Sequence, residues 1–253
     1  MKTENRFFKW GLLFLALTGF FSSCKEDEAP EIQDTFYGTA VQVGNGKVQA
    51  VVKLNSLGAP ETVGIVFSEE VLINLPGEMK TYELELPEQA GQTPFKHLTF
   101  DWNPHGHDPN GIYNLPHFDM HFYMISKENR MDIGQEDPKG EKLPPAGYMP
   151  DNYVPFPGVV PQMGKHWGDP LSPELNGETF TKTFLMGSYN EMTIFYEPMM
   201  TTAYLQGKPN ETINLAVPRH YHETGRYYPT QYSISYHADK KEYAIRLQGF
   251  VKR

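Results

Sequence analysis

Alternating apolar and polar residues dominate the chain from about residue 36 and predict β-strands, whose side chains point to opposite faces with a period of two. The clearest hairpin joins residues 37–43 to residues 47–54, with Asn45 and Gly46 suited to the positive φ values of a tight turn. Further strands are expected at residues 62–67, 81–86, 95–102, 117–125, 180–186, 192–196, 213–217, 231–236 and 243–250, with an ambiguous piece at 71–75. The pattern predicts a mainly β fold, a single antiparallel sandwich or a barrel-like domain, since either arrangement covers or closes its sheet edges.

Two segments depart from this alternation. Pro198 can occupy the first turn of a helix and Gly207 can end one, so residues 199–206 are predicted as the one short helix. Residues 127–161 are proline-rich and charged, without periodicity, and are expected to form a long loop that covers a functional site.

The strand expected at residues 117–125 has the sequence HFDMHFYMI. A period of two places His117, Asp119, His121 and Tyr123 on one face and Phe118, Met120, Phe122 and Met124 on the other. One face is expected to enter the core, and the other to present polar groups.

The N-terminus has the pattern of a secretory signal. Lys2, Arg6 and Lys9 precede an apolar block at residues 10–17. That block is shorter than the roughly 20 apolar residues that a membrane helix needs. Small residues then lead to Cys24, an ending that resembles the lipobox of bacterial lipoproteins, and the resemblance implies that Cys24 becomes the diacylated first residue of the mature chain. A signal peptide followed by an incidental free thiol is the alternative.

We therefore expect three regions: a signal peptide at residues 1–23, an acidic flexible tether at 24–35 and a β-rich domain at 36–253. The acidic residues after Cys24 resemble the export tag of some surface lipoproteins of Gram-negative bacteria, although an ordinary solvated linker has the same composition. The expected location is the cell envelope. We expect a lipid anchor in the outer membrane, with the β-rich domain either on the cell surface or on the inner side of that membrane.

Charge and cysteine content narrow the chemistry. Removal of residues 1–23 takes away three basic residues and one acidic residue, so the formal charge changes from -9 to about −11. Nucleic acid is therefore not an expected partner, because binding phosphates requires a basic surface. Cys24 is the only cysteine, so no disulfide can form within the chain and any metal must be held by nitrogen and oxygen ligands.

Histidines are concentrated between residues 105 and 166. His105 and His107 form an H-x-H pair whose side chains would lie about 6.6 Å apart on an extended segment, close enough to converge on one ion. His117 and His121 are about 13 Å apart along a strand and cannot easily share one. The candidate metal ligands are His105, His107, His117, His121, His166 and Glu197, a set that suits zinc, iron, manganese or nickel.

An ion with an open coordination position would permit Lewis-acid or hydroxide chemistry. Asp119, Tyr123 and Trp167 are the residues expected to contact a small-molecule ligand beside it. Alternatively, these histidines bind no metal, and they only form hydrogen bonds within a loop and along the polar face of a strand. The chain would then be a non-enzymatic surface binding module or a structural envelope protein. His220 and His222 repeat the H-x-H spacing, but Arg219 and Arg226 nearby oppose a cation. No serine-nucleophile elbow or cysteine nucleophile is present, which disfavours serine and thiol hydrolases.

Three runs carry a family resemblance: WNPHGHDPNGIYNLPHFDMHFYMIS at residues 102–126, PQMGKHWGDPLSPELNG at 161–177 and TFLMGSYNEMTIFYEPMMT at 183–201. They resemble a family of uncharacterised bacterial β-rich proteins, a domain of unknown function. The resemblance implies one compact, mainly β domain, with homo-oligomers as an option, and carries no activity or substrate. A looser similarity to cupin barrels, in an H-x-H followed by Glu and His, does not extend to the spacing, because Glu197 lies far beyond the position of the cupin carboxylate.

Overall fold

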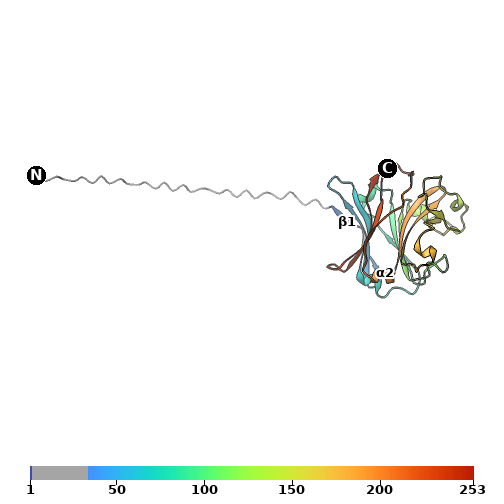
Figure 1. Ribbon diagram of the computed structural model, residues 1–253, viewed down its shortest axis with the longest axis horizontal. Helices are drawn as coiled ribbons and strands as arrows, with labels where there is room; N and C mark the ends of the chain where they lie inside the picture. The colour runs from blue at the N-terminus through green and yellow to red at the C-terminus, as the bar shows by residue number, and fades with distance from the viewer. Residues whose placement is uncertain (2–33) are drawn as a thin grey trace. The chain divides into compact units, whose positions relative to one another are not determined.

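Two antiparallel sheets face each other in the computed structural model, which describes residue 1 and residues 34–253 (Figure 1). The first sheet has the strand order β1-β3-β4-β15-β14-β12, with β2 paired to β3, and the second has the order β5-β6-β7-β11-β10-β9-β8. A third, two-stranded sheet pairs β13 with β16. The first sheet combines strands from both ends of the chain, and these are blue, teal and red in Figure 1.

The strands of the first sheet are β1 (Thr35–Tyr37), β2 (Val41–Val43), β3 (Gly46–Leu54), β4 (Pro60–Ser68), β12 (Asn210–Asn214), β14 (Gln231–His237) and β15 (Glu242–Gln248). Those of the second are β5 (Lys80–Leu84), β6 (His97–Asn103), β7 (His117–Tyr123), β8 (Val154–Pro155), β9 (Lys165–Gly168), β10 (Lys182–Tyr189) and β11 (Met192–Thr201). The small sheet contains β13 (Tyr227–Tyr228) and β16 (Val251–Lys252). The helices are α1 (Lys127–Met131) and α2 (Thr202–Gln206), with 3₁₀ turns at Glu69–Leu72, Glu88–Gln92, Pro138–Glu141 and Pro173–Asn176.

The main hydrophobic core lies between the two large sheets. Phe67 of β4 packs against Phe100 of β6 with ring centroids 5.3 Å apart, and Phe184 of β10 meets Tyr232 of β14 at 5.0 Å. These residues belong to one continuous cluster of buried side chains from both sheets. The predicted mainly β fold is confirmed, and of the two arrangements left open it is the sandwich, not the closed barrel.

The first hairpin is confirmed, with its turn one residue earlier than expected. Val43 pairs with Gly46, so Gly44 and Asn45 are the two turn residues. The positive φ falls on Gly44, at 52°, where the lack of a Cβ removes the steric cost. The 3₁₀ turn Glu69–Leu72 includes only the first two residues of the segment 71–75 that the sequence left ambiguous.

The predicted helix at residues 199–206 was too long. Met199 and Met200 instead continue β11, because both are fully buried and pair with β7 and β10. Pro198 lies opposite Phe184 of β10, at a point where the pairing of β11 with β7 is interrupted, so its missing N–H costs the sheet little. Helix α2 begins only after Thr201, whose hydroxyl accepts a hydrogen bond from Tyr204 N at 3.2 Å.

The long proline-rich segment at residues 127–161 is ordered by its own buried side chains. It contains α1, one 3₁₀ turn and β8, and it buries Arg130, Ile133, Met149 and Val159. Sequence periodicity could not show these short elements, because none exceeds five residues.

The predicted signal peptide and Cys24 lie outside the described residues, as does nearly all of the predicted tether. Within the described part of the chain, no helix has the length and apolar character needed to cross a membrane.

Candidate metal centre

A buried polar patch lies on the face of the second sheet that points away from the sandwich core. On β7, Phe118, Met120 and Phe122 enter the core, and the alternate residues His117, Asp119 and His121 form the other face, as the sequence predicts. All three of these polar residues are at most 3% exposed. Burial of three ionisable side chains on adjacent positions of one strand face is costly unless each has partners.

Neighbouring strands supply those partners through register. Asn103, Asp101 and Thr99 of β6 lie directly opposite His117, Asp119 and His121 of β7. On the other side of β7, Glu197 of β11 lies two residues from Met199, the partner of Asp119. His166 of β9 joins from the far edge, where it pairs with Gly187 of β10.

The first of two ligand groups, which we call the His107 group, consists of His107, His117 and Asp119. His107 Nε2 lies 3.1 Å from Asp119 Oδ2, and His117 Nε2 lies 3.0 Å from Asp119 Oδ1. Asp119 Oδ2 also accepts a hydrogen bond from Asn103 Nδ2 at 2.7 Å. The carboxylate is therefore fixed between two imidazoles.

The second group, which we call the His121 group, consists of His121, His166 and Glu197. His121 Nε2 lies 3.3 Å from Glu197 Oε1, and His166 Nε2 lies 3.4 Å from Glu197 Oε2. The side chains of His121 and Glu197 are 0% and 1% exposed, and that of His166 is 15% exposed. Each group thus offers two histidines and one carboxylate.

Three of the four histidines have their Nδ1 atom held by an oxygen. His107 Nδ1 contacts the Asp108 carbonyl at 2.7 Å, and His117 Nδ1 contacts the Leu115 carbonyl at 2.6 Å. His121 Nδ1 contacts Asp101 Oδ2 at 2.8 Å. An oxygen acceptor requires a proton on Nδ1, so in the neutral ring the lone pair is on Nε2, the atom that each histidine directs into its group. Metal-bound histidines are oriented in the same way.

Several of these inward-directed atoms have no hydrogen-bond partner in the described part of the chain. They are His117 Nε2, Asp119 Oδ1, His121 Nε2 and Glu197 Oε2. Two of these atoms belong to each group, and all four are buried. A buried unpaired polar atom costs about 1–3 kcal/mol, so four of them in one patch indicate a missing partner.

Burial and neighbouring charge set the pKa values here. Burial alone lowers the pKa of His121, but the charge of Glu197 and the hydrogen bond to Asp101 outweigh it and raise the pKa to about 9. Burial raises the pKa of Glu197 to about 8, against the opposing charge of His121. Burial lowers the pKa of His166 to about 3, which keeps that ring neutral. The titrations of His121 and Glu197 are therefore coupled, because the charge of each group shifts the pKa of the other.

A cavity of about 590 Å³ opens onto both groups. His107 and Asp119 line it from one group, and His166 and Glu197 line it from the other. Its remaining wall is largely apolar and includes Tyr113, Phe156, Val160, Met163 and Leu185. Phe156 and Val160 belong to the long segment at residues 127–161, so that segment does border the site, as expected from the sequence.

The structure brings together five of the six predicted ligands and excludes His105. His105 is exposed and outside both groups, because Gly106 adopts a φ of 68° and turns the backbone between the two histidines. The 6.6 Å spacing of an extended H-x-H pair therefore does not apply. Of the residues expected to contact a ligand, Asp119 belongs to the His107 group, and Tyr123 stacks on His121 with ring centroids 5.3 Å apart.

Trp167 lies elsewhere, in the sandwich core, with Nε1 donating to Ser188 Oγ at 2.8 Å. Asp101, Thr99 and Asn103 were not predicted from the sequence, although the alternation in LTFDWN places their side chains on one strand face. That alternation was the available signal.

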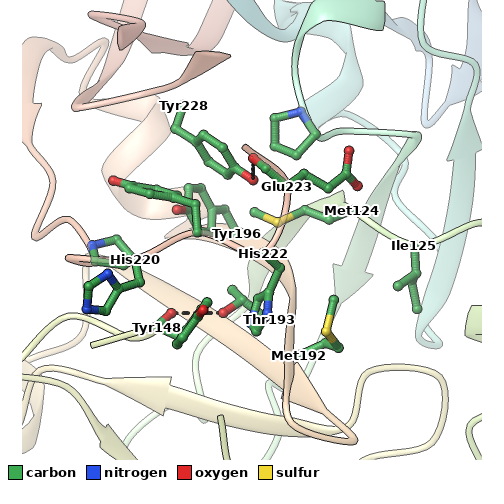
Figure 2. Close-up of a pocket in the computed structure, with 13 residues that line it drawn as sticks. Met124, Ile125, Tyr148, Met192, Thr193, Tyr196, His220, His222, Glu223 and Tyr228 are labelled. Carbon is green, nitrogen blue, oxygen red and sulfur yellow. Dashed lines mark hydrogen bonds between the residues drawn. The ribbon is translucent and has the colours of Figure 1, made fainter. Parts of the chain in front are cut away.

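The second H-x-H pair lines a different, small cavity of about 40 Å³. Figure 2 shows His220 and His222 beside Tyr148, and the ring of Tyr148 stacks on that of His222 with centroids 4.3 Å apart. These two histidines are in neither ligand group. Arg219 forms an ion pair with Asp151, at 3.0 Å. The arrangement is one of packed aromatic rings.

One comparison with known proteins gives a match. The model of a family described as TTHB210-like, hypothetical protein TTHB210, matches residues 56–102, which run from the end of β3 through most of β6. The match supports similarity to an uncharacterised domain and includes Asp101, but none of the six ligands of the two groups. No curated protein and no solved structure matches the chain.

Proposed function

We propose that this chain is an exported, lipid-anchored protein that binds a divalent transition-metal ion at the His121 group. The observation that carries the proposal is the pair of buried, unpartnered atoms His121 Nε2 and Glu197 Oε2, directed toward His166 in a cavity wall. Two imidazoles and one carboxylate suit zinc, iron, manganese or nickel.

Ligand spacing supports this assignment. Atoms bound to one ion at about 2.1 Å in tetrahedral geometry are about 3.4 Å apart. The Glu197 contacts are of this length, 3.3 Å from Oε1 to His121 Nε2 and 3.4 Å from Oε2 to His166 Nε2, and one ligand atom from each of the three residues lies within 4.8 Å of the others. Asp101 supplies the outer partner of His121, the carboxylate–histidine arrangement that raises the basicity of a metal ligand.

The chemistry open to this centre is Lewis-acid catalysis or activation of water. Three protein ligands leave coordination positions free, and His166 and Glu197 line the cavity through which a small molecule can enter. The apolar wall formed by Phe156 and Leu185 favours a substrate with an apolar portion.

Metal analysis tests the proposal. The full-length chain would be extracted in detergent through a tag that contains no histidine, dialysed against zinc, iron, manganese or nickel, and assayed by plasma mass spectrometry. We expect tightly bound ion in the wild type and its loss from the His121 group in a His166→Ala, Glu197→Gln variant. A matched His220→Ala, Glu223→Gln variant, altered at the separate small cavity, is expected to retain the ion. Wild-type protein that stays empty with all four metals would contradict the proposal.

Lipid anchoring is tested separately, because Cys24 lies outside the described residues. The proposal predicts incorporation of labelled fatty acid into the wild type and none into Cys24→Ser, with that variant released from the membrane fraction. Equal labelling of both proteins would contradict it.

A further inference from the structure

The His107 group is a second complete set of metal ligands that the proposed function does not use. His107 Nε2 lies 3.1 Å from Asp119 Oδ2 and His117 Nε2 lies 3.0 Å from Asp119 Oδ1, lengths close to the roughly 3.0–3.4 Å between neighbouring ligands of one ion. One ligand atom from each of the three residues lies within 4.8 Å of the others. His107 and His117 both direct Nε2 inward, since a backbone carbonyl holds each Nδ1.

An ion pair within the group is the simpler interpretation, and it accounts for only half of the contacts. His107 Nε2 hydrogen-bonds Asp119 Oδ2, so that oxygen is satisfied. His117 Nε2 and Asp119 Oδ1, although 3.0 Å apart, lack the alignment of a hydrogen bond, and both remain buried without a partner. A cation between them would coordinate both atoms at once, whereas the 3.0 Å ion pair brings the two groups together without a hydrogen bond in a buried site.

The two groups share one strand and one cavity. Asp119 and His121 are two residues apart on β7, which places their Cα atoms about 6.6 Å apart. His107 and Asp119 line the same cavity as His166 and Glu197. Ions held by the two groups would therefore be exposed to the same bound molecule, as in metal centres that act on one substrate from two sides.

The geometry points to a second divalent transition-metal ion in the His107 group, so that the cavity holds two ions side by side. This inference rests on the proposed function, because it adds an ion to the one assigned to the His121 group. Asp119 is the carboxylate ligand of the second site. Asn103, on the neighbouring strand β6, fixes the orientation of this carboxylate through its hydrogen bond to Oδ2.

Zinc stoichiometry tests the inference. Full-length protein would be equilibrated with zinc by dialysis, and the bound metal would be measured against protein concentration by amino-acid analysis. We expect about two equivalents in the wild type and about one in either His107→Ala, His117→Ala or His166→Ala, Glu197→Gln. His105→Ala is the matched control, since that exposed histidine belongs to neither group, and it is expected to keep both ions.

The outcomes separate the two proposals. One equivalent in the wild type that persists in His107→Ala, His117→Ala overturns the second site and leaves the first. If the wild type binds one equivalent of zinc and each of the two double variants binds none, the inference is also overturned, because residues of both groups then serve a single ion. No bound zinc or other metal overturns both proposals. If the histidine double variant does not fold, as judged by circular dichroism, the isosteric Asp119→Asn variant replaces it, with the same expected loss of about one equivalent.

Discussion

Replacement of Asp101 by asparagine tests whether the His121 group is built to bind metal. Asp101 Oδ2 accepts hydrogen bonds from His121 Nδ1 at 2.8 Å and from Thr99 Oγ1 at 2.7 Å. The Asp101→Asn variant keeps the size of the side chain and an oxygen acceptor but removes the negative charge. It therefore isolates the electrostatic contribution of Asp101 to an ion bound on the opposite side of the His121 ring.

The magnitude follows from the distance. An ion on His121 Nε2 would lie about 7 Å from Asp101 Oδ2, since the 2.8 Å contact adds to roughly 4 Å across the ring and the metal bond. Attraction between one negative charge and a divalent cation at that distance is about 1 kcal/mol at the dielectric constant of water and about 5 kcal/mol at an effective value of 20. Loss of an outer-shell carboxylate typically weakens metal binding about 10–100-fold, or about 1.4–2.7 kcal/mol, within this range.

The assay is competition for zinc between the protein and a chromophoric chelator at fixed pH. Asp239→Asn is the matched control, because it removes the same charge at an exposed turn between β14 and β15. We expect the dissociation constant of the ion in the His121 group to rise about 10–100-fold in Asp101→Asn and to stay within about twofold in Asp239→Asn. An unchanged constant in a folded Asp101→Asn protein would refute the assigned role of Asp101.

Three further predictions follow from the described residues. His105→Ala should leave metal content unchanged, because His105 is exposed and outside both groups; loss of metal by plasma mass spectrometry would restore the H-x-H hypothesis. Burial and the charge of Arg130 lower the pKa of His97 from 6.5 to about 4, so the unfolded chain takes up a proton at His97 before the folded chain does as the pH falls. Relative to His97→Phe, the wild type should therefore lose about 1–2 kcal/mol of stability between pH 6.5 and 4, a value reduced to allow for partial exposure. If the unfolding free energies of the two proteins, measured with urea, change in parallel over this pH range, the prediction is refuted. A Cβ on Gly187 would lie 1.9 Å from the Phe195 ring, so Gly187→Ala should lower the urea midpoint by the equivalent of about 1–3 kcal/mol, and an unchanged midpoint would show that the ring moves freely.

The strands and the polar face of β7 could be predicted from the sequence because both depend on a local period of two. The alternation in HFDMHFY separates His117, Asp119 and His121 from the core residues without knowledge of any other strand. It also made a single ion shared by His117 and His121 a weak proposal, and the structure places the two histidines in different groups.

Other features depend on contacts that sequence spacing does not contain. His166 and Glu197 approach His121 only because β9, β10, β11 and β7 are neighbours in the second sheet. His105 was misplaced because the expected spacing assumed an extended backbone, whereas Gly106 is left-handed; a Cβ there would lie 1.8 Å from the Tyr113 carbonyl oxygen. The helix at residues 199–206 was too long because burial in the sheet outweighed the helix-start preference of Pro198.

The most direct test of the metal centre is an anomalous difference map from a crystal of the zinc-equilibrated protein, collected on both sides of the zinc absorption edge. A peak bonded to His121 Nε2, His166 and Glu197 is the predicted result. A map without a peak at these residues, from crystals in which the cavity is not blocked by a neighbouring molecule, would contradict the account.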